Sequence, residues 1–161
     1  MEEQGRRIQN VFVVLLIVFP LFLTAVVKYA PLFTSRPEIH SVSVVPPRLY
    51  GSKDFNDTEE DVTRRLREGI AGIPGIEVRP SPTAGASALG EDVQKIAAAV
   101  GADALVITAV TIDSGIIQLN VEIIDAKTKR ILYANPFQSS EANYPGMMRA
   151  AAAALKRELQ R

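Results

Sequence analysis

The sequence predicts an α/β (mixed α+β) domain, in the element order β-α-β-α-β-β-β-α, behind one N-terminal transmembrane helix. Three observations predict this arrangement. The first is an uncharged apolar run at Val11–Val27. The second is the alternation of β-rich and helical stretches in the first half of the chain, which favours parallel strands joined by helices. The third is a pair of hairpin signals in the second half, which favours antiparallel strands. We therefore expect a mixed five-stranded sheet with helices packed on it.

Strands are predicted where apolar and β-branched residues cluster between turn signals. The stretch Ala104–Thr111 is apolar almost throughout, which is typical of a strand inside a covered sheet. In the stretch that follows Asp113-Ser114-Gly115, apolar residues alternate with Gln118, Asn120 and Glu122, which predicts one buried and one wetter face. The five predicted strands span 41–45, 76–79, 104–111, 117–123 and 131–134.

Each predicted helix has a recognisable start or end. Thr58 is placed to cap the first helix, and the three acidic residues after it complement the helix dipole. The second helix, 91–100, ends at Gly101, and the third begins at Pro145. Loops or linkers are predicted at 48–57, 80–90 and 136–143.

The run Val11–Val27 predicts a membrane anchor. Its seventeen residues would rise about 26 Å as a helix, close to the roughly 30 Å thickness of the hydrocarbon core. Pro20 would kink such a helix, which lipid-embedded helices tolerate. We predict a polar tail at 1–10, a transmembrane signal-anchor at 11–30, a tether at 31–40 and an extracytoplasmic α/β domain at 41–161.

The charges that flank the run only weakly predict its orientation. Arg6 and Arg7 precede it and Lys28 and Arg36 follow it, so the positive-inside bias slightly favours a cytoplasmic N-terminus. This orientation predicts a single-pass protein of the inner (cytoplasmic) membrane with a periplasmic C-terminal domain. The alternative is a signal peptide cleaved near Ala25, which would yield a secreted protein.

Composition excludes several classes of function. Lys plus Arg equals Asp plus Glu, at 18 each, and the charges are interspersed along the chain, which argues against a nucleic-acid partner. The chain has no cysteine, so disulfides, thiol catalysis and thiolate metal sites are excluded.

Residues that could perform catalysis or bind a metal do not form a recognised pattern. His40 is the only histidine and has no evident partners, so a surface role is favoured. An acidic group precedes and opens the first helix, but it lacks the alternating ligands and the glycine of a calcium loop. That group is Asp54, Asp57, Glu59, Glu60 and Asp61. Phosphate-loop and nucleophile-elbow motifs are absent from the sequence. We therefore predict no catalytic, cofactor-binding or metal-binding residue, no cofactor, no small-molecule substrate and no enzyme activity.

From Ser41 to about Gln138 the chain resembles the TolB N-terminal-like and CsgG-like domains of bacterial envelope and regulatory proteins. The matching segments, in order, are VSVVP (42–46), TEE (58–60), IPGIEV (73–78), GADALV (101–106) and VEIIDAKT (121–128). The sequence departs from the family pattern in three places. Lys129 stands where glycine is usual, Pro47 where an aromatic is common, and Thr108-Ala109 where glycine is frequent. The resemblance implies a binding or assembly module and assigns no residue a catalytic role.

The function predicted is that of a non-enzymatic, membrane-anchored envelope protein whose periplasmic domain binds or assembles with other envelope proteins. One alternative is a cytoplasm-facing sensor or regulatory domain on the same anchor, and a weaker one is a hydrolase with an unrecognised site. The candidate interaction residues are Arg48, Tyr50 and Phe55, in the predicted loop 48–57, because aromatic residues and arginine are enriched at the centres of interfaces. The alternative for Tyr50 and Phe55 is that they pin this loop to the core.

Overall fold

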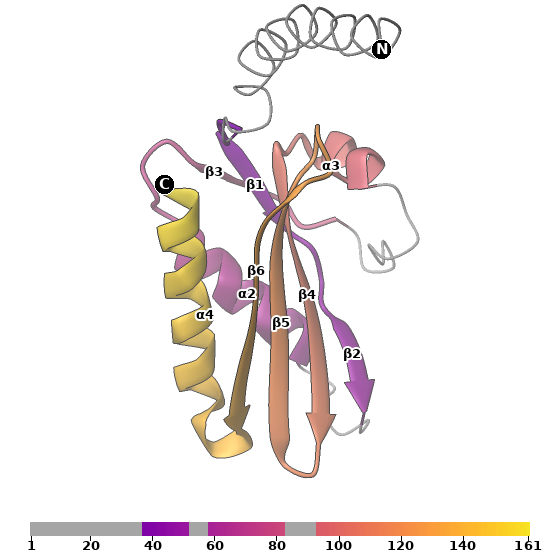
Figure 1. Ribbon diagram of the computed structural model, residues 1–161, viewed down its shortest axis with the longest axis vertical. Helices are drawn as coiled ribbons and strands as arrows, with labels where there is room; N and C mark the ends of the chain where they lie inside the picture. Colours follow the sequence, from indigo (N-terminus) through magenta and orange to yellow (C-terminus); the bar gives the residue numbers. More distant parts are fainter. Residues whose placement is uncertain (1–36, 52–57, 83–92) are drawn as a thin grey trace, which may run out of the picture. The chain divides into compact units, whose positions relative to one another are not determined.

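A computed structural model of the protein describes residues 37–51, 58–82 and 93–161 (Figure 1). Residues Glu38–Arg161 belong to one compact unit. Its strands are β1 (Ser41–Val44), β2 (Arg48–Gly51), β3 (Glu77–Arg79), β4 (Ala104–Asp113), β5 (Ile116–Asp125) and β6 (Ile131–Ser140). Its helices are α2 (Thr58–Ile70), α3 (Val93–Val100) and α4 (Tyr144–Leu159), and a short 3₁₀ helix, Glu141–Asn143, precedes α4.

The strands form one mixed sheet in the order β3-β1-β4-β5-β6, with β2 also paired to β4. The pairs β1–β3, β1–β4 and β2–β4 are parallel, whereas β4–β5 and β5–β6 are antiparallel. The two-residue turn between β4 and β5 has positive φ at both Ser114 (49°) and Gly115 (77°), as type I′ hairpins require. The mixed α/β prediction and the first hairpin are confirmed.

The segment Arg48–Gly51, predicted as part of a loop, is a strand. It pairs in parallel with Ala109–Ile112, so the sheet has six strands rather than five. The reason lies in the length of β4, because β1 pairs only with its first part, Ala104–Val106. Pro46-Pro47 interrupts the pairing, and the chain then returns to the same edge of β4, where it satisfies backbone groups that would otherwise lack partners.

The predicted linker 136–143 is also partly wrong, because β6 continues through Pro136 to Ser140. Proline normally ends a strand since it cannot donate to the ladder. β6 lies at the edge of the sheet, where a residue needs hydrogen bonds on only one side. The strand therefore keeps its pairing with β5 as far as Ile116↔Ser140.

The helices cover the two faces of the sheet unequally. α2 and α4 share one face and enclose the main core, in which Leu66, Met148 and Leu155 meet the strands. On the other face α3 covers only a small cluster that includes Ile96 and Leu105. Figure 1 shows α2 behind the strands and α3 at the upper end of the sheet. Among the residues that the structure describes, no helix therefore covers most of the second face of β4, β5 and β6.

The contact between α2 and α4 depends on small residues. A Cβ atom placed on Gly69 would lie 2.3 Å from the Cβ of Ala152, so the two helices approach too closely for a side chain there. Ala151 and Ala154 are buried on the same helix. The alanine run 150–154 is thus a packing surface as well as a sequence of high helix propensity.

Within residues 37–51, 58–82 and 93–161, no helix combines the length and apolarity needed to cross a membrane. The predicted anchor, Val11–Val27, lies outside these described residues.

One buried hydroxyl makes a stability prediction possible. Thr108 is 2 % exposed, lies in β4 beneath α2 and α4, and its Oγ1 has no hydrogen-bond partner among the described residues. An unsatisfied buried hydroxyl costs about 1–3 kcal/mol. Thr108→Val should therefore raise the free energy of unfolding by about 1 kcal/mol, measured by urea denaturation.

Thr111 provides the matched control. It lies three residues along the same strand on the opposite, helix-free face and is half-buried. Thr111→Val should change the unfolding midpoint little. A Thr108→Val protein no more stable than the parent would show that the hydroxyl is satisfied.

Candidate functional site

The candidate site is the face of the sheet that α2 and α4 leave uncovered, which we name the open face. Strand register defines its side chains, because residues directly opposite each other in neighbouring strands point to the same side. The open face comprises Arg48, Tyr50, Ile107, Ala109, Thr111, Asp113, Ile116, Gln118, Asn120, Glu122, Ala134, Pro136, Gln138 and Ser140.

The side chains of the open face form straight rows across four strands. One row runs from Tyr50 through Thr111 and Gln118 to Gln138. The next runs from Arg48 through Ala109 and Asn120 to Pro136. Hydroxyl and amide groups therefore alternate with small apolar side chains on one continuous surface.

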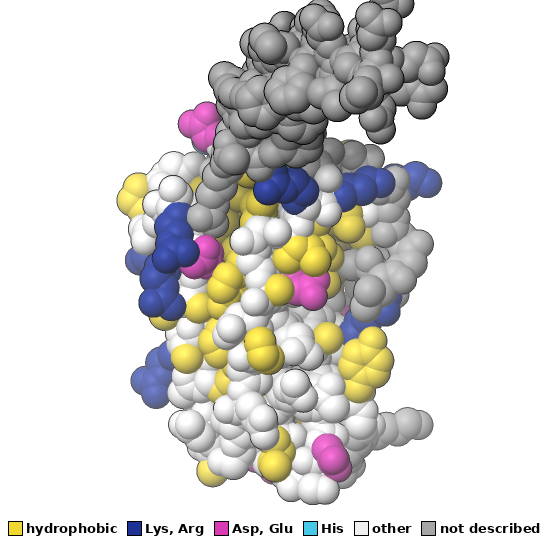
Figure 2. All heavy atoms as spheres, in the orientation of Figure 1, with side chains coloured by type: hydrophobic (Ala, Val, Ile, Leu, Met, Phe, Trp, Pro, Cys, Tyr) yellow, Lys and Arg dark blue, Asp and Glu magenta, His cyan; other side chains and the backbone are white. Residues whose placement is uncertain are grey.

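The surface is largely uncharged. Glu122 is the carboxylate near its middle, and Arg48 lies at its β2 edge. Figure 2 shows mostly white and yellow side chains over the strands, whereas basic side chains gather at the upper end and the left margin. Two of the exposed large hydrophobic residues, Tyr50 (49 %) and Ile116 (46 %), belong to this face.

The structure describes two of the three predicted interaction residues, Arg48 and Tyr50. Tyr50 lies on the open face, in a strand rather than a loop, and about half of its surface is exposed. Arg48 lies on the same strand, is half-buried and already interacts with another group of the protein. Phe55 lies outside the described residues.

The edges of the sheet are less suited to pairing with another chain than its open face is to docking. On one side the edge is formed by β3 and β2, which are three and four residues long, and on the other side β6 carries Pro136 in its middle. Short strands and proline are the usual ways in which proteins protect an edge from β-pairing. A partner would therefore find more continuous surface on the open face.

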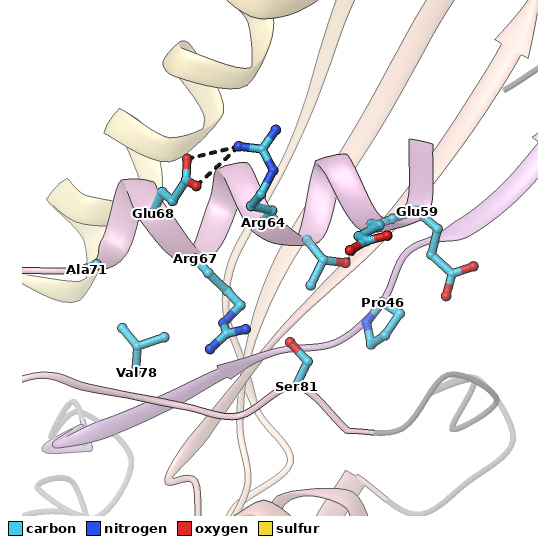
Figure 3. A pocket seen from close by; sticks show the side chains of 10 residues that line it. Pro46, Glu59, Arg64, Arg67, Glu68, Ala71, Val78 and Ser81 are labelled. Atoms are coloured by element: carbon cyan, nitrogen blue, oxygen red, sulfur yellow. Dashed lines mark hydrogen bonds and ion pairs between the residues drawn. The ribbon is translucent and has the colours of Figure 1, made fainter. Parts of the chain in front are cut away.

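A groove of about 840 Å³ lies on the other side of the sheet, between α2 and the segment from Val78 to Ser81. Figure 3 shows the Arg67 side chain extending from α2 into this groove, between Val78 and Ser81. Arg64 on its rim is held by Glu68, with an Nη1–Oε1 distance of 3.2 Å. The lining residues include no histidine and no cysteine, so the groove holds no imidazole or thiolate beside its hydroxyls.

The one histidine does not assemble a catalytic group. His40 Nε2 lies 3.6 Å from the carboxylate of Glu38, and both side chains are exposed. Ser41 and Asp103 are neighbours, but the Ser41 hydroxyl donates directly to Asp103 Oδ2 (2.9 Å), with no imidazole between them. Among the residues that the structure describes, no cluster of three or more His, Cys, Asp or Glu side chains could hold a metal.

Asp103 instead fixes the start of the domain. Its Oδ2 accepts hydrogen bonds from the backbone N–H groups of His40 (3.0 Å) and Ser41 (2.9 Å) as well as from the Ser41 hydroxyl. Its backbone N–H donates to the Ser41 carbonyl (3.0 Å), and its carbonyl accepts from Ala126 N–H (2.8 Å). The Gly-Ala-Asp motif therefore joins the beginnings of β1 and β4 to the end of β5.

A second carboxylate joins α2 to α4. Asp61 accepts hydrogen bonds from Arg65 Nε (2.6 Å) and from the Tyr144 hydroxyl (3.0 Å), and the Arg65 guanidinium lies 5.7 Å from the centre of the Tyr144 ring. Burial raises the pKa of Tyr144, and the bond to Asp61 raises it further. This network gives Asp61, one of the acidic residues at the start of α2, a structural role in the contact between the two helices.

Comparison with solved structures shows the same fold in several proteins from bacteria. PelC from Paraburkholderia phytofirmans, described as a dodecamer, aligns with a TM-score of 0.58 over 80 % of this chain and 96 % of its own, at 15 % identity. Lipoprotein GNA1162 from Neisseria meningitidis aligns with a TM-score of 0.51 over 72 % and 95 %, at 20 % identity. The chain has the fold of these proteins.

The C-terminal domain of LpoB from Escherichia coli shares it too, with a TM-score of 0.52 over 68 % of this chain and 90 % of its own, at 17 % identity. No protein-family model matches the sequence, and no curated protein matches it either. The likeness at these identities concerns the fold alone. The expectation of an α/β domain similar to those of bacterial envelope proteins is thus confirmed at the level of the fold.

Sequence reasoning found part of the open face and missed the rest. The wetter face of β5, with Gln118, Asn120 and Glu122, was predicted from its alternation and is confirmed. Pro136 and Gln138 were missed because proline was taken to end the strand. The signal that could have found them is the length of β5, since ten residues in a hairpin need a partner of similar length.

The lowered pKa of Asp103 predicts a specific acid sensitivity. Burial alone would raise this pKa, but the hydrogen bonds from Ser41 and His40 outweigh it and hold the pKa below its usual value of 3.8. A carboxylate with a depressed pKa stabilises the fold above its unfolded pKa and loses this contribution as pH falls through the folded pKa. Urea midpoints of the parent should therefore drop more steeply below about pH 4 than those of Asp103→Asn.

Two further variants separate charge from hydrogen bonding. Asp103→Ala removes the acceptor and should destabilise at pH 7 more than Asp103→Asn, which keeps one side-chain oxygen. Asp113→Asn, at the β4–β5 turn and exposed, is the matched control and should behave like the parent. Equal acid sensitivity in the parent and Asp103→Asn would contradict this role of the carboxylate.

Proposed function

We propose that this protein is a non-enzymatic component of the bacterial cell envelope that binds another envelope protein through the open face. The observation that carries the proposal is the helix-free side of β2, β4, β5 and β6, which leaves a continuous, mostly neutral surface exposed. A sheet face without helices exposes side chains in fixed rows, which is suited to recognition of a protein surface. Neutral polar groups with a few aromatic or aliphatic residues are typical of such interfaces.

The fold supports this proposal. PelC shares it and is a dodecamer, so this arrangement of strands and helices is compatible with surfaces that bind other protein chains. GNA1162, which also shares it, is a lipoprotein. We infer by analogy that the domain 41–161 works at a membrane, and that Val11–Val27 is its single-pass anchor in the inner membrane with the domain in the periplasm.

We propose that Tyr50, on the open face, is the main contact residue, supported by Arg48 on the same strand and by Phe55, which lies outside the described residues. Tyr50 combines a large apolar ring with a hydroxyl and is exposed on an edge strand. Tyrosine and arginine are over-represented among the residues that dominate binding energy.

A photoreactive residue at Gln118 in the intact chain would capture the partner in native membranes. Tyr50→Ala should reduce this cross-linking strongly, because truncation of a central aromatic contact typically costs more than 1 kcal/mol of binding energy. The melting temperature should stay nearly unchanged, because the ring is half exposed.

Leu49 is the matched control for Tyr50. It is also exposed (41 %) and adjacent in sequence, but its register with Val110 places it on the opposite side of the sheet. Leu49→Ala should leave the cross-linked product unchanged. If Tyr50→Ala lowered the melting temperature by several degrees, the ring would be a core residue and its proposed role as a contact would be wrong.

The anchor is tested by Leu16→Arg in the full chain. A charge near the middle of a transmembrane helix costs about 2.5–3.5 kcal/mol on insertion scales. The variant should be released from membranes by alkaline carbonate, whereas Leu16→Ala should be retained. Carbonate-resistant association of Leu16→Arg would contradict the anchor.

A further inference from the structure

The fold brings basic side chains that are interspersed in the sequence together at one end of the domain. The end of the domain where the chain enters β1 carries many basic side chains, and we name it the basic end. Its exposed cations are Lys95, Lys127, Lys129, Arg130, Lys156 and Arg157. At the opposite end, Asp113 and Glu141 flank the β4–β5 turn, where Glu141 N–H bonds to the Gly115 carbonyl (3.2 Å).

Hydrogen bonds place the basic turn directly beside the start of β1. Asp103 binds the backbone of His40 and Ser41 and also accepts from Ala126, the residue before Lys127. On the same turn the Asp125 side chain accepts from the Thr128 hydroxyl (2.6 Å). The turn that carries Lys127, Lys129 and Arg130 is therefore fixed next to the point where the chain enters the domain.

The end of α4 lies at the same end of the sheet. Burial raises the pKa of the Tyr133 hydroxyl, the charge of Glu158 raises it further, and the charge of Arg157 lowers it. These two residues of α4 therefore lie near Tyr133, close to the start of β6. Figure 1 shows the C-terminus and the β5–β6 turn both at the upper end of the domain.

The acidic side chains of the basic end are mostly engaged within the protein. Glu77 pairs with Arg79 (2.9 Å) and Glu158 pairs with Arg161 (3.0 Å). Asp103 and Asp125 are held in the hydrogen-bond networks described above. Glu38 lies near the His40 side chain. Hydrogen bonds do not remove the charge of these carboxylates, but the basic side chains named at this end outnumber them among the described residues, which leaves an excess of positive charge.

Lys129 adds an independent observation. It has φ of +58°, in the left-handed region, where a side chain costs roughly 1–2 kcal/mol relative to glycine. The hydrogen bond from Lys129 N–H to the Asp125 carbonyl (2.9 Å) closes the turn in this conformation, and the side chain that the turn presents is a cation.

We propose that the basic end binds the anionic headgroups of the membrane in which the chain is anchored. The proposal rests on the proposed anchor, because the tether 31–40 can span at most about 35 Å and so holds this end of the domain near the bilayer. Anionic lipid attracts nearby lysine and arginine with an energy that amounts to about a fivefold gain in binding per residue. Docking by the basic end would hold the opposite end of the domain away from the lipid, together with the part of the open face next to the β4–β5 turn.

The absence of cysteine makes a direct test possible. The full chain is inserted into phosphatidylcholine vesicles, with or without phosphatidylglycerol, and carries one fluorophore on Gln160→Cys at the basic end or on Gln138→Cys at the far end. Energy transfer to a headgroup-labelled lipid reports the distance from the bilayer. Phosphatidylglycerol should increase transfer from position 160 and not from position 138, and about 1 M salt should abolish the increase.

Substitutions test which basic side chains contribute to lipid binding. Arg130→Gln should lower the ratio of docked to undocked protein about fivefold, and replacement of Lys127, Lys129 and Arg130 together by glutamine should lower it about 100-fold. Arg149→Gln, on the exposed side of α4 away from this end, is the matched control and should have no effect. Lys129→Gly should raise the melting temperature by relieving the backbone strain, yet weaken docking about fivefold.

The outcomes separate the two proposals. A chain that carbonate extracts from the vesicles would refute the anchor and, with it, the lipid contact. A chain that is retained but shows the same transfer from position 160 in both kinds of vesicle would refute the lipid contact alone. Docking that is unchanged in the triple variant would equally overturn it.

Discussion

The pairing of β4 along both of its edges is the constraint on which the rest of the structure depends. β5 lies along its whole length on one side, and β1 and then β2 share the other side. Because β1 is short, the chain must return after Pro46-Pro47 to cover the rest of that edge. Because β5 is ten residues long, β6 must continue past Pro136 to match it. The same pairing aligns Tyr50, Thr111, Gln118 and Gln138 into one row of the open face.

Unequal covering of the two faces follows from where the apolar residues of the strands lie. On the side of α2 and α4, the side chains of β4 from Val106 to Ile112 are apolar apart from Thr108, and those of β5 from Ile117 to Ile123 are all apolar. On the other side, α3 has eight residues and covers only the beginning of β4 and the end of β5. The remaining positions are amides, hydroxyls and small residues, which tolerate water. They therefore need no helix above them and remain available to a partner.

Much of this architecture could be predicted from the sequence, and the exceptions have physical causes. The 3.6-residue and 2-residue periodicities located α2, α4 and β5, because burial on one face imposes them, and the continuous apolar run 104–111 located β4. Turn residues such as Gly51 hid β2. Pro136 hid the second half of β6, because the cost of proline in a strand depends on whether the strand lies at an edge, which only the topology shows. The concentration of basic side chains at one end of the domain could not be predicted from the sequence. Lys127, Arg130 and Arg157 are distant or unremarkable in sequence, and only the fold brings them to the end where β1 begins.

The central claim is that the domain stands outside the cytoplasm with its open face engaged by another protein. Labelling with a membrane-impermeant maleimide tests it most directly, since the chain contains no other cysteine. In spheroplasts Arg149→Cys, exposed on α4, should react readily, whereas Gln118→Cys on the open face should react slowly until detergent separates the protein from its partner. Reaction of Arg149→Cys only after the membrane is broken would contradict the periplasmic location. Equal, rapid reaction at both positions in spheroplasts would contradict an occupied open face.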